Sequence, residues 1–135
     1  MVQSLGHVAL RVTDMTRSIE FYCGVLGMRK VFEVMGKDGK AEMAYLKIRD
    51  GQYLELFPAL DQEAGIVHSP VGFLHLCFTV EDIELAAQNL RDKGWPIRVE
   101  PKVGNYGNKQ LWIRDPDGVD MELMQILPDF LWGNA

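Results

Sequence analysis

The stretch Asp50-Gly51-Gln52-Tyr53-Leu54-Glu55-Leu56 recurs later in the chain as Asp117-Gly118-Val119-Asp120-Met121-Glu122-Leu123. Each copy closes a segment that begins near a histidine, His7 in the first segment and His75 in the second, and the two histidine-to-glutamate spacings differ by one residue. A repeat of about 67 residues is longer than a solenoid unit, which usually has roughly 20 to 50 residues. Duplication of a small α/β module explains the pattern better.

The composition indicates a single soluble domain of 135 residues. The net charge is −5 and the basic residues are scattered, which argues against nucleic acid because phosphate contacts need clustered Lys and Arg. No apolar run approaches the roughly 20 residues of a membrane span, and the N-terminus lacks the pattern of a signal peptide. We therefore expect a cytoplasmic protein that does not bind membranes, with Cys23 and Cys77 as reduced, buried apolar residues.

Local patterns predict the same order of elements in both halves, namely a strand, a helix and three strands. In the first half these are a strand at 5–12, a helix at about 15–25 that follows the N-cap candidate Asp14, and strands at 31–34, 41–48 and 52–57. In the second half they are a strand at 73–80, a helix at about 82–92 led by Asp82, and strands near 97–100, 109–114 and 119–126. The predicted modules are residues 5–57 and 72–127, joined by a linker at 58–71 and followed by a tail at 128–135.

Strand parity places His7, Glu55, His75 and Glu122 on polar faces, because side chains two residues apart in a strand point the same way. Taken alone, a strand histidine or glutamate is more often a hydrogen-bonded or solvent-facing residue. The equivalent positions in both halves, and the cost of burying such groups unpaired, favour a shared divalent metal site. Imidazole and carboxylate ligands suit Ni²⁺, Zn²⁺, Co²⁺, Mn²⁺ or Fe²⁺. The third histidine, His68, has no counterpart and is expected to be a solvated loop residue.

The chain resembles the vicinal oxygen chelate superfamily. The resembling residues are His7 through Val12 with Asp14, the run from Arg17 to Tyr22 that leads into Val25-Leu26-Gly27-Met28, and Asp115-Pro116-Asp117-Gly118 before Met121-Glu122-Leu123. The resemblance implies an α+β fold of paired βαβββ modules, which form a partly open eight-stranded mixed sheet or half-barrel with helices outside. Within the superfamily, the chain is similar to the short bacterial kind of lactoylglutathione lyase, or glyoxalase I.

This likeness implies that His7, Glu55, His75 and Glu122 are the metal ligands on the first, fourth, fifth and eighth strands. It also implies a lyase or isomerase that detoxifies methylglyoxal by isomerising its hemithioacetal with glutathione. Glu122 is then the expected base, and Glu55 a ligand and second proton carrier. The family pairs its modules across a homodimer, although an arrangement within one chain also exists in the superfamily.

Two cationic side chains are candidates for binding the substrate. Arg11 matches the arginine that contacts a glutathione carboxylate in the family, and a solvated strand arginine is the alternative. Lys109 binds an anionic substrate group, pairs with a surface acid or stays in water. The sequence departs from many glyoxalases at Ala59, where they carry an asparagine as a second glutathione anchor. This leaves open another metal-dependent enzyme of the superfamily, such as a keto-compound isomerase, an epimerase or a dioxygenase, and a non-catalytic ligand-sequestering protein.

Overall fold

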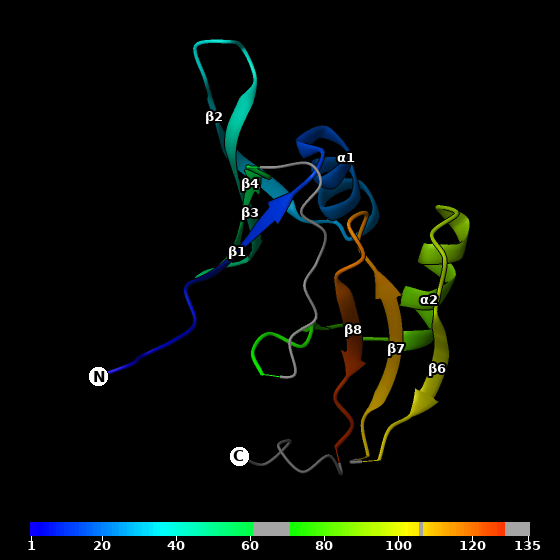
Figure 1. Cartoon of the computed structure of the whole chain (residues 1–135). Coiled ribbons are helices and arrows are strands. Elements are labelled where there is room, and N and C mark those ends of the chain that lie inside the picture. The colour runs from blue at the N-terminus through cyan, green and yellow to red at the C-terminus, as the bar shows by residue number, and fades with distance from the viewer. Residues whose placement is uncertain (61–70, 106, 129–135) are drawn as a thin grey trace. The chain divides into compact units, whose positions relative to one another are not determined.

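The computed structural model describes residues 1–60, 71–105 and 107–128. The chain divides into two compact units, Met1–Gly65 and Ile66–Ala135, and each contains one four-stranded sheet with its helices (Figure 1). No helix in these ranges is long and apolar enough to cross a membrane. His68, most of the predicted linker and all but the first residue of the predicted tail lie outside the described residues.

The first unit follows the predicted order of strand, helix and three strands. Its elements are β1 (His7–Val12), α1 (Met15–Ile19), η1 (Glu20–Val25), β2 (Arg29–Met35), β3 (Ala41–Arg49) and β4 (Gln52–Pro58). The sheet order is β1-β4-β3-β2, with β1 parallel to β4 and the other pairs antiparallel. The first and last strands of the unit are therefore neighbours.

The helix of the first unit begins as predicted and then changes its winding. The Asp14 side chain accepts a hydrogen bond from the Arg17 amide at 3.0 Å, as an N-cap does. From Glu20 onward the helix is a π-helix, whereas the sequence predicted one α-helix over about 15–25. A π turn rotates successive side chains by less than an α turn, so that the adjacent Phe21 and Tyr22 both enter the core, where they are 2% and 0% exposed.

The second unit repeats this order with one regular helix. Its elements are β5 (Leu76–Thr79), α2 (Ile83–Asp92), β6 (Val99–Val103), β7 (Lys109–Arg114) and β8 (Asp120–Gln125). The sheet order is β5-β8-β7-β6, with β5 parallel to β8. Asp82 caps α2 by accepting hydrogen bonds from the amides of Glu84 and Leu85.

Strand β5 is shorter than the strand predicted at 73–80. Leu76 pairs with Met121, so Phe73 and Leu74 would need partners at positions 118 and 119. Gly118 has a φ of +88° and belongs to the turn before β8, which starts only at Asp120. His75 therefore lies immediately before β5 rather than inside it.

Alternation along the strands separates a core face from a polar face in each sheet. Leu54 and Leu56 of β4 are buried, as are Met121 and Leu123 of β8, whereas Glu55 and Glu122 between them lie on the opposite face. The expectation for the cysteines is wrong, because Cys23 is only partly buried and Cys77 is exposed. Cys77 lies on the polar face of β5, where parity turns it away from the core.

The two central hairpins reach equivalent pairings through different turns. Residues 50 and 51 form a two-residue loop between β3 and β4, in which Gly51 has a φ of +76°, and β3 has a bulge between Lys47 and Arg49 just before the loop. Residues 115–119 form the longer loop between β7 and β8. Despite this difference, Glu55 pairs with Tyr45 and Glu122 pairs with Trp112.

Candidate functional site

The parallel pairing of β1 with β4 brings His7 and Glu55 together in the first unit. His7 is level with Tyr53, and Ala9 is level with Glu55, so the two side chains lie on one face of adjacent strands. The His7 Nε2 atom is 3.4 Å from the Glu55 Oε2 atom. The two predicted site residues of the first unit therefore form a pair.

The second unit contains the equivalent pair. His75 Nε2 is 3.4 Å from Glu122 Oε2, the same separation as in the first unit. Cys77 is level with Glu122 as Ala9 is level with Glu55, so the two pairs occupy corresponding places in the duplicated modules. The duplication that the sequence indicates thus extends to the geometry of the polar side chains.

The separation within each pair fits two ligands of one metal ion. It is longer than the usual N–H···O hydrogen bond of about 2.9 Å. Two ligand atoms that each lie about 2.1 Å from a tetrahedral zinc ion are roughly 3.4 Å apart. Among the residues that the structure describes, no group of three or more candidate ligands converges, so each unit by itself supplies two of the four predicted ligands.

An aromatic residue lies beside each imidazole, and sequence reasoning did not single out either of them. The ring of Tyr45 has an edge-on arrangement with His7 at 6.3 Å between centroids, and Trp112 has the same arrangement with His75 at 4.8 Å. Each aromatic residue is the cross-strand partner of the ligand glutamate. Both aromatic residues could have been found from the sequence by pairing the two strands of each hairpin across its Asp-Gly turn. Hairpin register fixes which residue lies opposite each glutamate.

Glu122 has two further neighbours in its own unit. Asn108 is 4% exposed, and its Nδ2 donates a hydrogen bond of 3.4 Å to Glu122 Oε1. Partial desolvation of the Cys77 thiol, followed by the charge of Glu122 and a hydrogen bond to its side chain, raises the pKa of Cys77 to about 12. Asn108 and Cys77 therefore restrain the carboxylate that the sequence predicts as base.

The polar faces of the two sheets differ beyond the two equivalent His–Glu pairs. In the first unit, Phe32, Tyr45 and Tyr53 form a stack with 5.1 Å between the centroids of neighbouring rings. In the second unit, the position equivalent to Tyr53 is Asp120, which is bonded by Arg98 and Arg114. The surroundings are therefore aromatic near His7 and ionic near His75.

The two predicted cationic binding residues lie in different environments. Arg11 is on the polar side of β1, and its Nη1 donates to the carbonyl oxygen of Pro58 at 3.1 Å. The Lys109 Nζ atom is 3.9 Å from Glu84 Oε1, a side chain of α2. Lys109 is thus near an acidic side chain on the helix side of the sheet, whereas Trp112 is on the opposite side.

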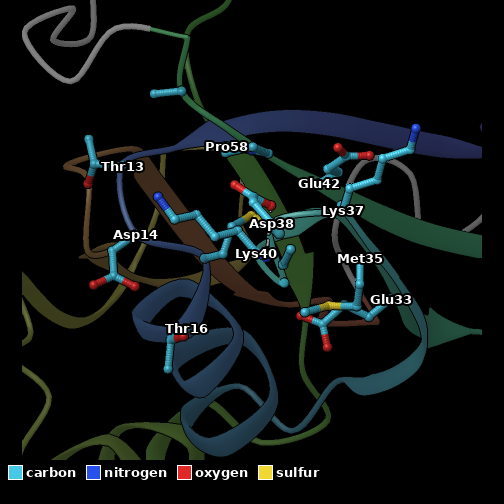
Figure 2. A pocket seen from close by; sticks show the side chains of 15 residues that line it. Thr13, Asp14, Thr16, Glu33, Met35, Lys37, Asp38, Lys40, Glu42 and Pro58 are labelled. Atoms are coloured by element: carbon cyan, nitrogen blue, oxygen red, sulfur yellow. Dashed lines mark hydrogen bonds between the residues drawn. The ribbon is translucent and has the colours of Figure 1, made fainter.

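The first unit also has an open groove between the tip of the β2–β3 hairpin and the start of α1 (Figure 2). Acidic and basic side chains line it, among them Asp14, Lys37, Asp38, Lys40 and Glu42. His7 and Glu55 do not line the groove, so it is separate from their pair. Ala59, where many glyoxalases carry an asparagine, lies at its margin.

Residues 4–123 match the family model described as Glyoxalase/Bleomycin resistance protein/Dioxygenase superfamily. The chain belongs to this superfamily. The matched range includes both His–Glu pairs, which lie in duplicated modules as the sequence analysis predicted.

Three similar proteins match this chain over nearly their full lengths. A Synechocystis protein named "Probable lactoylglutathione lyase" is 33% identical over 125 residues, which are 90% of this chain and 94% of that protein. The crystal structure of SMU.1112c is 32% identical, with a TM-score of 0.79 and coverage of 93% of this chain and 100% of that one. A glyoxalase family protein from Enterococcus faecalis is 28% identical, with a TM-score of 0.77 and coverage of 91% and 98%.

These matches confirm the predicted superfamily and its α+β fold, seen here as two open four-stranded mixed sheets with few helices. The names of the relatives indicate an enzyme of the glyoxalase superfamily.

Proposed function

We propose that this protein is a metal-dependent lyase of the glyoxalase I type, which converts the hemithioacetal of methylglyoxal and a thiol into a lactoyl thioester. The observation that carries the proposal is the pair of equivalent His–Glu arrangements, each with the 3.4 Å separation of two ligands of one ion. Membership of the glyoxalase superfamily supports it, as does the relative named as a lactoylglutathione lyase.

In this proposal His7, Glu55, His75 and Glu122 hold one divalent transition metal ion, such as Ni²⁺, Zn²⁺, Co²⁺, Mn²⁺ or Fe²⁺. The donor set of two imidazoles and two carboxylates suits these ions. When bound, the ion supplies electrostatic stabilisation of the negative charge that develops on the substrate oxygens. The protein is expected to act as a homodimer on a small-molecule substrate.

The reaction itself moves two protons, one from the carbon that bears the sulfur to the neighbouring carbon and one from the hydroxyl oxygen of the first carbon to the oxygen of the second. The Glu122 carboxylate removes the proton from the carbon that bears the sulfur and returns it to the neighbouring carbon, so that no atom is gained or lost. Asn108 and Cys77 keep this carboxylate oriented through their hydrogen bonds. Glu55, which sits in the equivalent place of the first unit, acts as a ligand and as the second proton carrier.

One observation favours a second candidate within the same chemistry. Ala59 has no side-chain group that could bind a carboxylate, at the position where many glyoxalases carry asparagine. An isomerase of a keto compound without a thiol would use the same proton transfer and the same four residues. The two candidates differ in whether turnover needs a thiol.

The test is an assay of metal-reconstituted protein with methylglyoxal and glutathione, in which thioester formation is followed with Ni²⁺, Co²⁺, Mn²⁺ or Zn²⁺. We expect turnover with at least one ion, one bound ion per chain by metal analysis, and a dimer by size-exclusion mass measurement. His75→Ala and Glu122→Gln should abolish turnover. Glu33→Gln is the matched control, because Glu33 forms only a surface ion pair with Lys30.

Two outcomes would decide against the proposal in different ways. Protein that binds none of these metals on titration rules out the metal site and with it the lyase. Protein that binds a metal but forms no thioester, while isomerising a keto compound without a thiol, supports the second candidate instead.

A further inference from the structure

We infer that Arg98, Arg114 and Asp120 form a carboxylate-binding subsite of the second unit, which takes an anionic group of the substrate near the His75–Glu122 pair. Arg98 immediately precedes β6, Arg114 ends β7 and Asp120 begins β8. The inference deepens the proposed function and rests on it for the identity of the substrate. No part of it depends on Arg11 or on Lys109.

The geometry of the subsite is that of two arginines braced by one acid. Arg98 Nη1 lies 2.5 Å from Asp120 Oδ1, and Arg114 Nε lies 2.8 Å from the same oxygen. Backbone contacts hold both arginines at their places, because the Arg98 amide donates to the Trp112 carbonyl and the Trp95 indole donates to the Arg114 carbonyl. The two guanidinium groups therefore converge on Asp120, one from the end of β7 and one from the residue before β6.

The subsite faces the same side of the sheet as the His75–Glu122 pair. Asp120 precedes Glu122 by two residues in β8, and Arg114 is the cross-strand partner of Asp120 as Trp112 is of Glu122. His75 is one residue before Leu76, whose partner is Met121, and so it is level with Asp120. A substrate held by His75 and Glu122 thus has the arginines at the end of the face where β8 begins.

The guanidinium groups of Arg98 and Arg114 and the carboxylate of Asp120 together carry a charge of +1. Each guanidinium has five N–H donors in a planar fork and cannot lose its proton at physiological pH. One contact to Asp120 positions each arginine and uses only part of this donor set. Both side chains remain nearly half exposed, so a carboxylate from solution can reach them.

The equivalent place in the first unit cannot serve the same purpose. Tyr53 takes the place of Asp120 and stacks on Tyr45, and Lys47, in the place of Arg114, is bonded to Asp50 of the adjacent turn. The arginine pair is thus an addition to the second module rather than a feature of the duplicated pattern. It also offers an anion site to a chain that has Ala59 instead of an asparagine anchor.

The experiment compares two thiols in the hemithioacetal assay, glutathione with its two carboxylates and 2-mercaptoethanol with none. For Arg98→Gln and Arg114→Gln we expect KM for the glutathione adduct to rise about tenfold each, as for loss of a hydrogen bond to a charged group. The kcat should change little, and KM for the 2-mercaptoethanol adduct should stay within about twofold. Added salt should weaken binding of the glutathione adduct in the wild type more than in the double variant.

Arg91→Gln is the matched control. Arg91 forms an ion pair with Glu100 at 2.5 Å and is 47% exposed, close to the 45% and 44% of Arg98 and Arg114, but it lies on α2. If the loss of an exposed ion pair were enough to raise KM, Arg91→Gln would raise it as much as Arg98→Gln or Arg114→Gln. We expect Arg91→Gln to leave both KM values unchanged.

A binding measurement separates this inference from the proposed lyase. Calorimetric titration with S-methylglutathione, which cannot react, should show weaker binding to the Arg98→Gln/Arg114→Gln variant whether or not the protein turns over a hemithioacetal. If the double variant binds S-methylglutathione more weakly than the wild type and neither protein turns over a hemithioacetal, the subsite is supported and the lyase is refuted. Equal binding of S-methylglutathione by the wild type and the double variant, or no binding by either, would overturn the subsite.

Discussion

Replacement of Asn108 by aspartate should convert a hydrogen bond into a repulsion between two carboxylates. The Asn108 amide lies 3.4 Å from Glu122 Oε1 and is 4% exposed, so the new carboxylate would meet Glu122 with little water between them. Two like charges at this distance repel by roughly 5 kcal/mol at an effective dielectric constant of about 20. We expect Asn108→Asp to lower the free energy of unfolding by roughly 3 to 5 kcal/mol at pH 7.

The same charge argument gives the sign of the pH dependence. In the unfolded chain both carboxyl groups ionise freely above their ordinary range of about 4. The folded variant relieves the repulsion by retaining a proton, so it binds more protons than the unfolded chain and loses stability as pH rises. The destabilisation relative to wild type should therefore be smaller at pH 5 than at pH 7.

The measurement is urea unfolding of chelator-treated protein at both pH values, with Asn108→Leu as the matched control of similar size. The leucine variant loses the hydrogen bond without gaining a charge, so it should cost about 1 to 2 kcal/mol with no added pH dependence. If Asn108→Asp were as stable as Asn108→Leu at pH 7, Asn108 would not face Glu122 as described.

Three further results are expected from the same region. In metal-free protein at pH 9, the raised pKa of the Cys77 thiol should make its alkylation at least tenfold slower than in urea-unfolded protein. Glu122→Gln should restore part of the rate. Equal alkylation rates in folded and unfolded protein would contradict the contact between Cys77 and Glu122. Gly104→Ala should lower activity, because a Cβ there would come within 2.9 Å of Asn108 Oδ1, whereas Gly24→Ala meets no atom within 4 Å and should leave activity unchanged. Removal of the metal by a chelator should lower the Tm of the wild type but not of His75→Ala, as for any ligand that binds only the folded state; an equal drop in both would argue against His75 as a ligand.

Local chemistry made much of the fold predictable. Asp14 and Asp82 cap helices where the sequence placed caps, and the Asp50-Gly51 turn forms the hairpin that its composition predicts. Strand parity placed Glu55 and Glu122 on the polar faces, and their neighbours Leu54 and Met121 are buried on the opposite faces. These features depend on a few adjacent residues, which is why a single sequence can reveal them.

Features that depend on tertiary packing were harder to predict from the sequence. The π-helix over Glu20–Val25 buries the adjacent residues Phe21 and Tyr22, and an α-helical period in the sequence does not predict this winding. The sequence indicated the residues of both His–Glu pairs from their repeat, but not Asn108, whose role follows from the path of the chain before β7. Cys77 was wrongly expected to be buried because the amino-acid type was given more weight than strand parity.

The assignment of the four metal ligands and of the base stays a prediction. What the structure adds is that each unit independently brings its histidine and glutamate to the same separation. Both copies of the duplicated module keep this pair at the same separation, although other positions of the same faces differ.

The two central hairpins have a practical consequence for engineering. One joins its strands through two residues and a bulge and the other through five residues, yet both place a glutamate opposite an aromatic residue. The paired residues are ten positions apart in both hairpins, and the bulge lets the shorter turn span the same number of residues. Deletion of one residue from the turn of residues 115–119 should therefore shift the register of β8 and turn Glu122 away from Trp112.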